Sequence, residues 1–276
     1  MTASDLEAAV AAAYGAIGHA LSEEDRHAIR FWNFIPAIHA DMGGARDRYM
    51  VFNAGRFDAF ASWFGSPQAF SRALPTASAV GIRRGPLVIH ALATTANGAP
   101  LENPRQVPAY SYSKRYGPRP PCFARATVLA DTPGVKGGWL LVGGTASILG
   151  EDSIHVRDAE RQAMETFANL SKLVASANTA RGGHVDASES SASTSSPATD
   201  TSPDATSDNT DTTDAENAWL ARFSHLRVYI VRASDAETLR ELVLERFTHC
   251  VDIEFAQADL CRQELLVEIE GLARLD

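Results

Sequence analysis

The chain has 276 residues, of which 45% are hydrophobic and 21% are charged, and its formal net charge is −9. This length suffices for about two domains with buried cores. No run of about 18 apolar residues occurs, and the first residues carry acids where a signal peptide needs a basic region and an apolar core. The sequence therefore predicts neither a membrane span nor export. Three cysteines without metal-ligand spacing, Cys122, Cys250 and Cys261, indicate reduced thiols in the cytoplasm.

Most of the negative charge lies in one segment. Residues 182–217 contain six Asp, two Glu and no Lys or Arg, together with many Ser and Thr. Such a segment has almost nothing to bury, so we expect a disordered acidic insertion there. The rest of the chain is nearly neutral and shows no basic stripe, which argues against a nucleic-acid-binding protein.

The first half reads as a mixture of helices and strands. Residues 4–7 have the spacing of a capping box and predict the start of a helix of about four turns. Aromatic residues recurring every three to five positions predict a second helix over residues 45–64. Three strands are expected, at residues 30–35, 77–82 and 87–94. The last two are predicted to be joined by a hairpin turn at residues 83–86.

Residues 102–121 differ from the segments on either side. They contain five prolines, three tyrosines and four cationic side chains, so they cannot form a helix or a central strand. We expect an ordered connecting loop rich in hydrogen-bond donors. The composition fits equally well with structural tyrosines and solvated cations.

The second half alternates strands and helices in the order β-β-α-β-α-β-β. Strands are expected at residues 123–130, 139–143, 226–230, 251–255 and 266–270, and helices at residues 155–177 and 234–247. A loop of small residues bounded by glycines is expected over residues 143–150. It matches neither a phosphate-binding loop nor a nucleophile elbow.

The segment 259–271 brings a thiol, a guanidinium and carboxylates together. Residues 266–270 alternate apolar with acidic, and Cys261 and Arg262 lie just upstream. The simplest interpretation is an amphipathic strand with solvated glutamates and a cysteine in the core. The eight histidines show no repeated spacing, so no metal site is expected.

Four motifs carry a family resemblance: ENPRQVPAY at 102–110, RYGPRPPCFARAT at 115–127, GTASI at 144–148 and CRQELLVEIE at 261–270. Together they resemble the chorismatase family, and the second half resembles RidA/YjgF proteins. The resemblance implies an α+β fold of two RidA/YjgF-like (chorismate mutase-like barrel) domains, with mixed sheets and helices packed on one face. We expect an N-terminal domain at residues 1–108 and a catalytic domain at 109–276, interrupted by the insertion 182–217. Related proteins carry further N-terminal sequence, so the resemblance implies either a first domain that is truncated and lacks strands or a wrongly assigned start of the sequence.

The resemblance also implies a reaction. Chorismatases cleave chorismate with loss of pyruvate, and the product is 3-hydroxybenzoate, in some members with 4-hydroxybenzoate, or a dihydroxycyclohexadienoate formed by hydrolysis. Chorismate is a dicarboxylate whose enolpyruvyl ether is stable until its methylene is protonated, so a site needs cations and an acid. By resemblance, Glu268 is the catalytic acid and Cys261 occupies the position that marks hydroxybenzoate-forming members. The substrate-binding residues expected are Arg119, Arg125, Tyr116, Gly144, Thr145 and Ala146.

We therefore expect a chorismatase that forms mainly 3-hydroxybenzoate. Ala146 resembles the hydrolytic members instead, which keeps the hydrolytic product open. The sequence is also compatible with a RidA-like enamine/imine deaminase or with a non-catalytic metabolite-binding module. No organic cofactor is implied, because protonation and elimination need neither redox chemistry nor an electron sink. The expected partner is the small-molecule substrate, and the sequence leaves open whether the protein is a monomer or a homo-oligomer.

Overall fold

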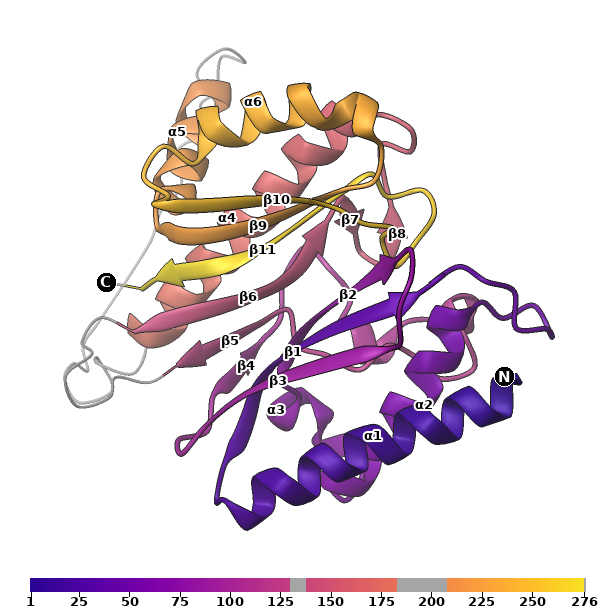
Figure 1. Cartoon of the computed structure of the whole chain (residues 1–276). Coiled ribbons are helices and arrows are strands. Elements are labelled where there is room, and N and C mark those ends of the chain that lie inside the picture. The colour runs from indigo at the N-terminus through magenta and orange to yellow at the C-terminus, as the bar shows by residue number, and fades with distance from the viewer. Residues whose placement is uncertain (130–137, 183–207, 276) are drawn as a thin grey trace, which may run out of the picture.

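The computed structural model describes residues 1–129, 138–182 and 208–275 (Figure 1). The first half contains α1 (Ala3–Glu23), β1 (His27–Pro36), α2 (Arg48–Trp63), η1 (Pro67–Ala69), α3 (Phe70–Ala73), β2 (Thr76–Ile82) and β3 (Val88–Thr94). Its three strands form one sheet. Apolar side chains of α1 and α2, among them Tyr14 and Phe60, share one buried cluster with Phe31 and Ile35 of β1. Both long helices therefore cover the same face of this sheet.

The expected hairpin between β2 and β3 is wrong, because the sheet order is β2-β1-β3. β1 pairs in parallel with β2 and antiparallel with β3, so residues 83–86 pass from one edge of the sheet to the other. Two physical features explain this arrangement. β1 carries fully buried side chains and takes the central position, and the α2 crossover between β1 and β2 is the connection that parallel strands require.

The capping box of α1 lies two residues before the expected one. The hydroxyl of Thr2 accepts from the backbone N of Asp5 at 3.2 Å, and the carboxylate of Asp5 accepts from the backbone N of Thr2 at 2.9 Å. The pair has the same three-residue spacing as the predicted pair at residues 4 and 7. Spacing alone could not choose between them.

The second half forms a six-stranded sheet with the order β10-β9-β11-β6-β5-β4. Its elements are β4 (Ala99–Leu101), η2 (Ala109–Ser111), η3 (Lys114–Tyr116), β5 (Ala126–Leu129), β6 (Trp139–Ala146), β7 (Ile148–Leu149), β8 (Asp152–Ser153), α4 (Ala159–Gly182), α5 (Asp208–Leu220), β9 (Phe223–Ile230), η4 (Ala233–Asp235), α6 (Ala236–Arg246), β10 (Asp252–Gln257) and β11 (Val267–Arg274). Side chains of α4, α5 and α6 share one buried cluster with β6, β9 and β11. The expected α+β class, with mixed sheets and helices on one face, is confirmed.

Two predictions near this sheet were wrong. Residues 143–146 are not a loop, because β6 continues to Ala146 and pairs with β11 there. Residues 208–217 are helical and not disordered, since they belong to α5. At the end of that helix Leu220 is fully buried and Trp219 packs against the same core, which supplies the apolar contacts that composition alone did not indicate. The rest of the expected insertion, residues 183–207, lies outside the described residues.

The connecting segment 102–121 contains only the short turns η2 and η3, as expected. β4 precedes it and yet pairs with β5, so the second sheet takes a strand from the N-terminal side of the predicted boundary at residue 108. That boundary stays a prediction.

The two halves meet along their strands. Thr76 at the start of β2 bridges to Ala124, and Gly81 at its end donates to the carbonyl of Asp259 at 2.7 Å. In Figure 1 the strands of both sheets lie between the helices of the first half and those of the second. None of the helices in the described residues is long and apolar enough to cross a membrane.

Candidate active site

A cavity of about 510 Å³ lies where the two halves meet. Its walls come from α2, β2, β6, β11, the connecting segment and the turn before β11. The lining residues are His39, Asp47, Tyr49, Met50, Arg56, Ala77, Ser78, Ala79, Tyr112, Arg115, Tyr116, Pro121, Phe123, Arg125, Gly144, Ala146, Ile148, Asp152, Ser153, Val156, Cys261, Arg262, Gln263, Glu264 and Glu268. Both polar and aromatic groups are therefore available to a small ligand.

Glu268 is the buried one of the acidic residues that line the cavity. It lies on β11, which pairs with β6 on one side and β9 on the other, so its backbone is held in the centre of the sheet. The side chain is 4% exposed, and Oε1 has no hydrogen-bond partner among the described residues. Burial and, to a smaller extent, the neighbouring Glu270 raise the pKa of Glu268 to about 8, although Arg125 and Arg30 oppose the rise. The carboxyl group is therefore protonated at neutral pH, as a general acid requires.

Gly144 leaves room for this carboxyl group. A Cβ atom at residue 144 would lie 2.1 Å from Oε1 of Glu268, closer than atoms can approach. The backbone N of Gly144 donates to Oγ of Ser78 at 2.9 Å. The glycine is thus needed for close approach to the acid and not for turn formation.

Two buried guanidinium groups border the same cavity. Arg125 is 4% exposed and donates to the hydroxyl of Tyr112 at 2.5 Å and to the carbonyl of Val107 at 3.2 Å, while its Nε has no hydrogen-bond partner within the described part of the chain. Arg56 is 1% exposed and donates to Asn53 at 2.8 Å, while its Nε and Nη1 have no hydrogen-bond partner in that part either. No ion pair with a carboxylate of the described residues neutralises either group, and a pair of such cations suits a dicarboxylate.

Cys261 lies in the turn before β11 and lines the cavity. Burial raises the pKa of its thiol to about 12, and the neighbouring Glu268 contributes to the rise. The thiol is therefore protonated at neutral pH and can move a proton, but it is not poised as a thiolate nucleophile.

Tyr116 lines the cavity, but its hydroxyl and its ring are both engaged by neighbouring protein groups. Its hydroxyl donates to the carbonyl of Glu151 at 2.5 Å, so the proton expected to reach a substrate carboxylate is already engaged. Arg262 stacks on its ring at 3.9 Å and donates to the same carbonyl at 2.9 Å and to Ser153 at 3.0 Å. These contacts fix one wall of the cavity.

Two of the predicted substrate-binding residues do not line the cavity. Arg119 is half exposed, lies 3.6 Å from Asp58 and stacks on Phe57 at 5.0 Å. Thr145 is buried and donates to the carbonyl of Gly143 at 3.0 Å. The predicted residues that the structure does bring together are Glu268, Cys261, Arg125, Tyr116, Gly144 and Ala146.

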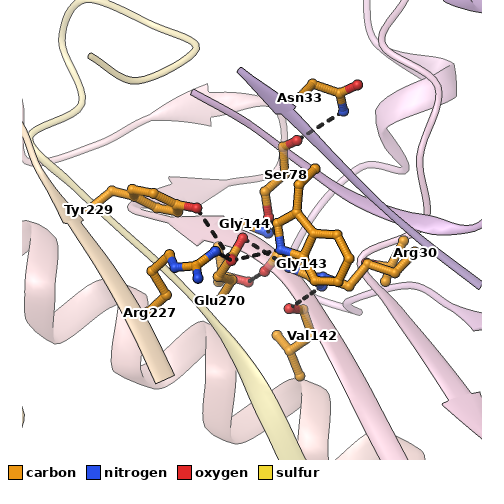
Figure 2. A network of polar contacts seen from close by, with 12 residues as sticks. Arg30, Asn33, Ser78, Val142, Gly143, Gly144, Arg227, Tyr229 and Glu270 are labelled. Atoms are coloured by element: carbon orange, nitrogen blue, oxygen red, sulfur yellow. Dashed lines mark hydrogen bonds and ion pairs between the residues drawn. The ribbon is translucent and has the colours of Figure 1, made fainter. Parts of the chain in front are cut away.

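Glu270 is also buried, so the interpretation of solvated glutamates is wrong for this strand. Figure 2 shows it at the centre of a polar network. Its carboxylate pairs with Arg30 at 2.9 Å and accepts from Trp32 at 2.9 Å and Tyr229 at 3.3 Å, while Arg227 lies 3.4 Å away. This ion pair joins β1 of the first half to β11 of the second.

Arg56 and Ser78 are among the cavity residues that sequence reasoning missed. Arg56 lies within the aromatic pattern that predicted α2, where an arginine is usually expected to reach solvent. Ser78 lies in a run of small apolar residues on β2. Among the described residues, no group of three His, Cys, Asp or Glu side chains could hold a metal ion.

Known proteins resemble this chain in sequence and in structure. Residues 1–93 match the profile of the N-terminal domain of FkbO/Hyg5-like chorismatases. The chain is 34% identical over 246 residues to a 3-hydroxybenzoate synthase of Streptomyces hygroscopicus, covering 88% of this chain and 62% of that protein. It is 28% identical over 244 residues to a chorismatase of Streptomyces rapamycinicus, covering 88% and 63%. A crystal structure of a chorismatase matches with a TM-score of 0.76 and 28% identity, over 96% of this chain and 70% of that one.

In sequence and in structure the chain is similar to chorismatases. The predicted residues that line the cavity lie in three of the four motifs that resemble chorismatases, and α2 and β2 add Arg56 and Ser78. The chain spans less than two thirds of the length of the curated relatives it matches.

Proposed function

We propose that this chain is a chorismatase, which cleaves chorismate, releasing pyruvate and forming mainly 3-hydroxybenzoate with some 4-hydroxybenzoate. The observation that carries the proposal is a protonated carboxyl group, that of Glu268, in the same cavity as two buried guanidinium groups. These groups belong to Arg125 and Arg56, and neither has a carboxylate partner among the described residues. A dicarboxylate with an acid-labile ether needs this combination. The relative named 3-hydroxybenzoate synthase supports the choice of product.

In the proposed reaction Arg125 and Arg56 hold the two carboxylates, and Glu268 delivers a proton to the terminal methylene of the enolpyruvyl group. The methylene becomes the methyl group of pyruvate and the ether oxygen becomes its keto oxygen, so the bond between that oxygen and the ring breaks. For 3-hydroxybenzoate, the oxygen of the neighbouring ring hydroxyl then bonds to the carbon that lost the ether oxygen and separates from its own carbon. The ring loses a proton as it becomes aromatic, so chorismate yields pyruvate and a hydroxybenzoate without consuming water. The protonated thiol of Cys261 lies in the same wall and is suited to pass on that proton.

A hydrolytic reaction is the second candidate, favoured by Ala146 in the cavity wall. It would consume one water molecule and give pyruvate with a dihydroxycyclohexadienoate. The two candidates share the protonation of the methylene and differ in the steps that follow it. Product analysis therefore separates them without affecting the assignment of the substrate.

The experiment is incubation of the purified chain with chorismate. Pyruvate is followed through lactate dehydrogenase and NADH, and the aromatic and diene products are separated by chromatography. We expect equal amounts of pyruvate and hydroxybenzoate. Pyruvate with the diene diol would support the hydrolytic candidate, whereas absence of pyruvate would refute both and return the choice to a deaminase or a binding module. The proposal includes the cytoplasmic location that the three free cysteines favour.

A further inference from the structure

Ser78 lies on β2 in the cavity wall and is 4% exposed. Its Oγ accepts two hydrogen bonds, from the backbone N of Gly144 at 2.9 Å and from Nη2 of Arg30 at 3.1 Å. Its own carbonyl accepts from Asn33 at 3.0 Å, which holds the strand in place. Figure 2 shows the serine between these groups.

Both groups that donate to Ser78 are fixed and cannot reverse their roles. A backbone N–H and a guanidinium are donors only. Arg30 is 3% exposed and is held by Glu270 at 2.9 Å and by the carbonyl of Val142 at 2.6 Å. The serine oxygen must therefore act as the acceptor in both contacts.

A hydroxyl group has two acceptor positions and one proton. Because both acceptor positions of Ser78 are occupied, its proton has to point away from Gly144 and Arg30. No hydrogen bond from this hydroxyl to another described residue is present. The network thus fixes the direction of the Ser78 hydroxyl at the cavity wall. This donor has no acceptor among the described residues.

The position of Ser78 next to the acid indicates which ligand group it meets. Ser78 and Glu268 both lie next to Gly144. Oγ of Ser78 accepts a hydrogen bond from the backbone N of Gly144, and Oε1 of Glu268 fills the space beside the Cα of Gly144. In an enolpyruvyl ether the methylene and a carboxylate are bonded to the same carbon atom. A donor beside the group that protonates the methylene therefore lies within reach of that carboxylate.

We propose that Ser78 is a substrate-binding residue whose hydroxyl donates to the enolpyruvyl carboxylate. This inference rests on the proposed function and adds a third carboxylate-binding group to Arg125 and Arg56. The carboxylate is charged in the bound substrate and stays charged through the reaction. Ser78 therefore contributes to binding and much less to the chemical step, which would appear in KM and not in kcat.

The test compares the wild type with Ser78→Ala, Ser78→Thr and Ser224→Ala. Ser224 is a matched control, because it is a partly buried serine on β9 whose hydroxyl donates to the carbonyl of Leu272 at 3.2 Å, away from the cavity. Loss of a hydrogen bond to a charged group should raise KM for chorismate about 10-fold in Ser78→Ala, with kcat within about threefold. We expect Ser78→Thr to recover most of the affinity and Ser224→Ala to match the wild type.

A fall in kcat at unchanged KM in Ser78→Ala would overturn the proposal, since it would show that the hydroxyl acts on Glu268. Equal effects in Ser78→Ala and Ser224→Ala would also overturn it. Chorismate binding, measured by tryptophan fluorescence, separates this proposal from the proposed function. If the wild type binds chorismate without releasing pyruvate, the function fails, and weaker binding by Ser78→Ala would still support the serine. Equal binding by the two proteins, or no binding by the wild type, refutes it.

Discussion

Oε1 of Glu268 occupies the space in which residue 144 would otherwise carry a side chain, 2.1 Å from the Cβ position of Gly144. In Gly144→Ala the carboxyl group of Glu268 has to move, because the end of a side chain is flexible whereas the backbone of a central strand is held in place. We expect turnover of chorismate to fall about 100-fold, the cost of misplacing a catalytic group by about 1 Å.

The control for this substitution is Gly15→Ala on α1, where nothing lies within 4 Å of the added Cβ. It should leave turnover unchanged and raise the free energy of unfolding by up to about 1 kcal/mol. Normal turnover in Gly144→Ala would mean that the carboxyl position is not critical.

Glu268→Gln removes the titratable proton while keeping the size of the side chain. We expect turnover to fall about 10²- to 10⁴-fold with little change in substrate binding. Wild-type turnover should decline above about pH 8, where Glu268 loses its proton. Steady-state pyruvate release across pH measures both effects, and a rate that rises through pH 8 would argue against Glu268 as the acid.

The same pKa predicts a change in stability. The folded protein holds the Glu268 proton up to about pH 8, whereas an unfolded glutamate has a pKa of 4.5. The folded state therefore binds more protons between these values, and stability is lost as the pH rises through this window. Relative to Glu268→Gln, the free energy of unfolding of the wild type should decrease from about pH 4.5 to pH 8, as urea denaturation would show.

Arg56 and Arg119 form a matched pair for substitution by glutamine. Arg56 is buried at the cavity, whereas Arg119 is half exposed beside Asp58. Arg56→Gln should raise KM for chorismate at least 10-fold, because a charge-assisted hydrogen bond to a carboxylate is lost. Arg119→Gln should change KM less than about twofold, since exposed ion pairs contribute little. The reverse order of effects would restore Arg119 as the binding residue.

Cys261→Ala should leave pyruvate release within a few-fold of the wild type. The protonated thiol is placed to steer the fate of the ring and not to cleave the ether. We expect the ratio of hydroxybenzoate to diene diol to change, which chromatography of the products measures. Cys250→Ala is the control, because Cys250 lies outside the cavity lining. An unchanged ratio in Cys261→Ala would make the cysteine a packing residue.

The acidic insertion can be tested in two lengths. Residues 183–207 have almost no apolar content, so a short Gly/Ser linker in their place should leave activity within a few-fold. A replacement that extends to residue 217 removes most of α5, including Glu216, which pairs with Arg246. We expect that longer replacement to lower the melting temperature, and equal melting temperatures would show that the packing of α5 adds no stability.

Local sequence patterns were sufficient for most of the elements but not for their pairing. Apolar residues recur with a period of two in β9 and β11 and with a period of 3.6 in α4, because each element buries one face. These periods predicted those elements well. The order β2-β1-β3 depends on contacts between distant residues, such as the pairing of Trp32 with Ser78 and His90. The short link at residues 83–86 looked like a hairpin, because turn composition does not reveal which strands are neighbours.

The predicted residues that line the cavity all lie in the family motifs, whereas Arg56 and Ser78 lie outside them. Glu268 and Arg125 stand within motifs and line the cavity. Arg56 has no such motif, and its burial depends on packing beneath Phe123, whose ring lies 5.7 Å from its guanidinium carbon. Arg119 is the opposite case: it stands within a motif but does not line the cavity, because a position inside a motif does not tell whether the side chain faces the cavity.

The position of β11 between β6 and β9 has a consequence for biosynthesis. β6 and β9 both precede β11 in the chain, and neither can complete its hydrogen bonds on that side until β11 arrives. A ribosome that has made β9 but not β11 therefore holds a nascent chain with two unpaired strand edges, which are prone to aggregate. The strand that brings the acid also closes these edges, so the nascent protein becomes resistant to aggregation and acquires its acid in the same step.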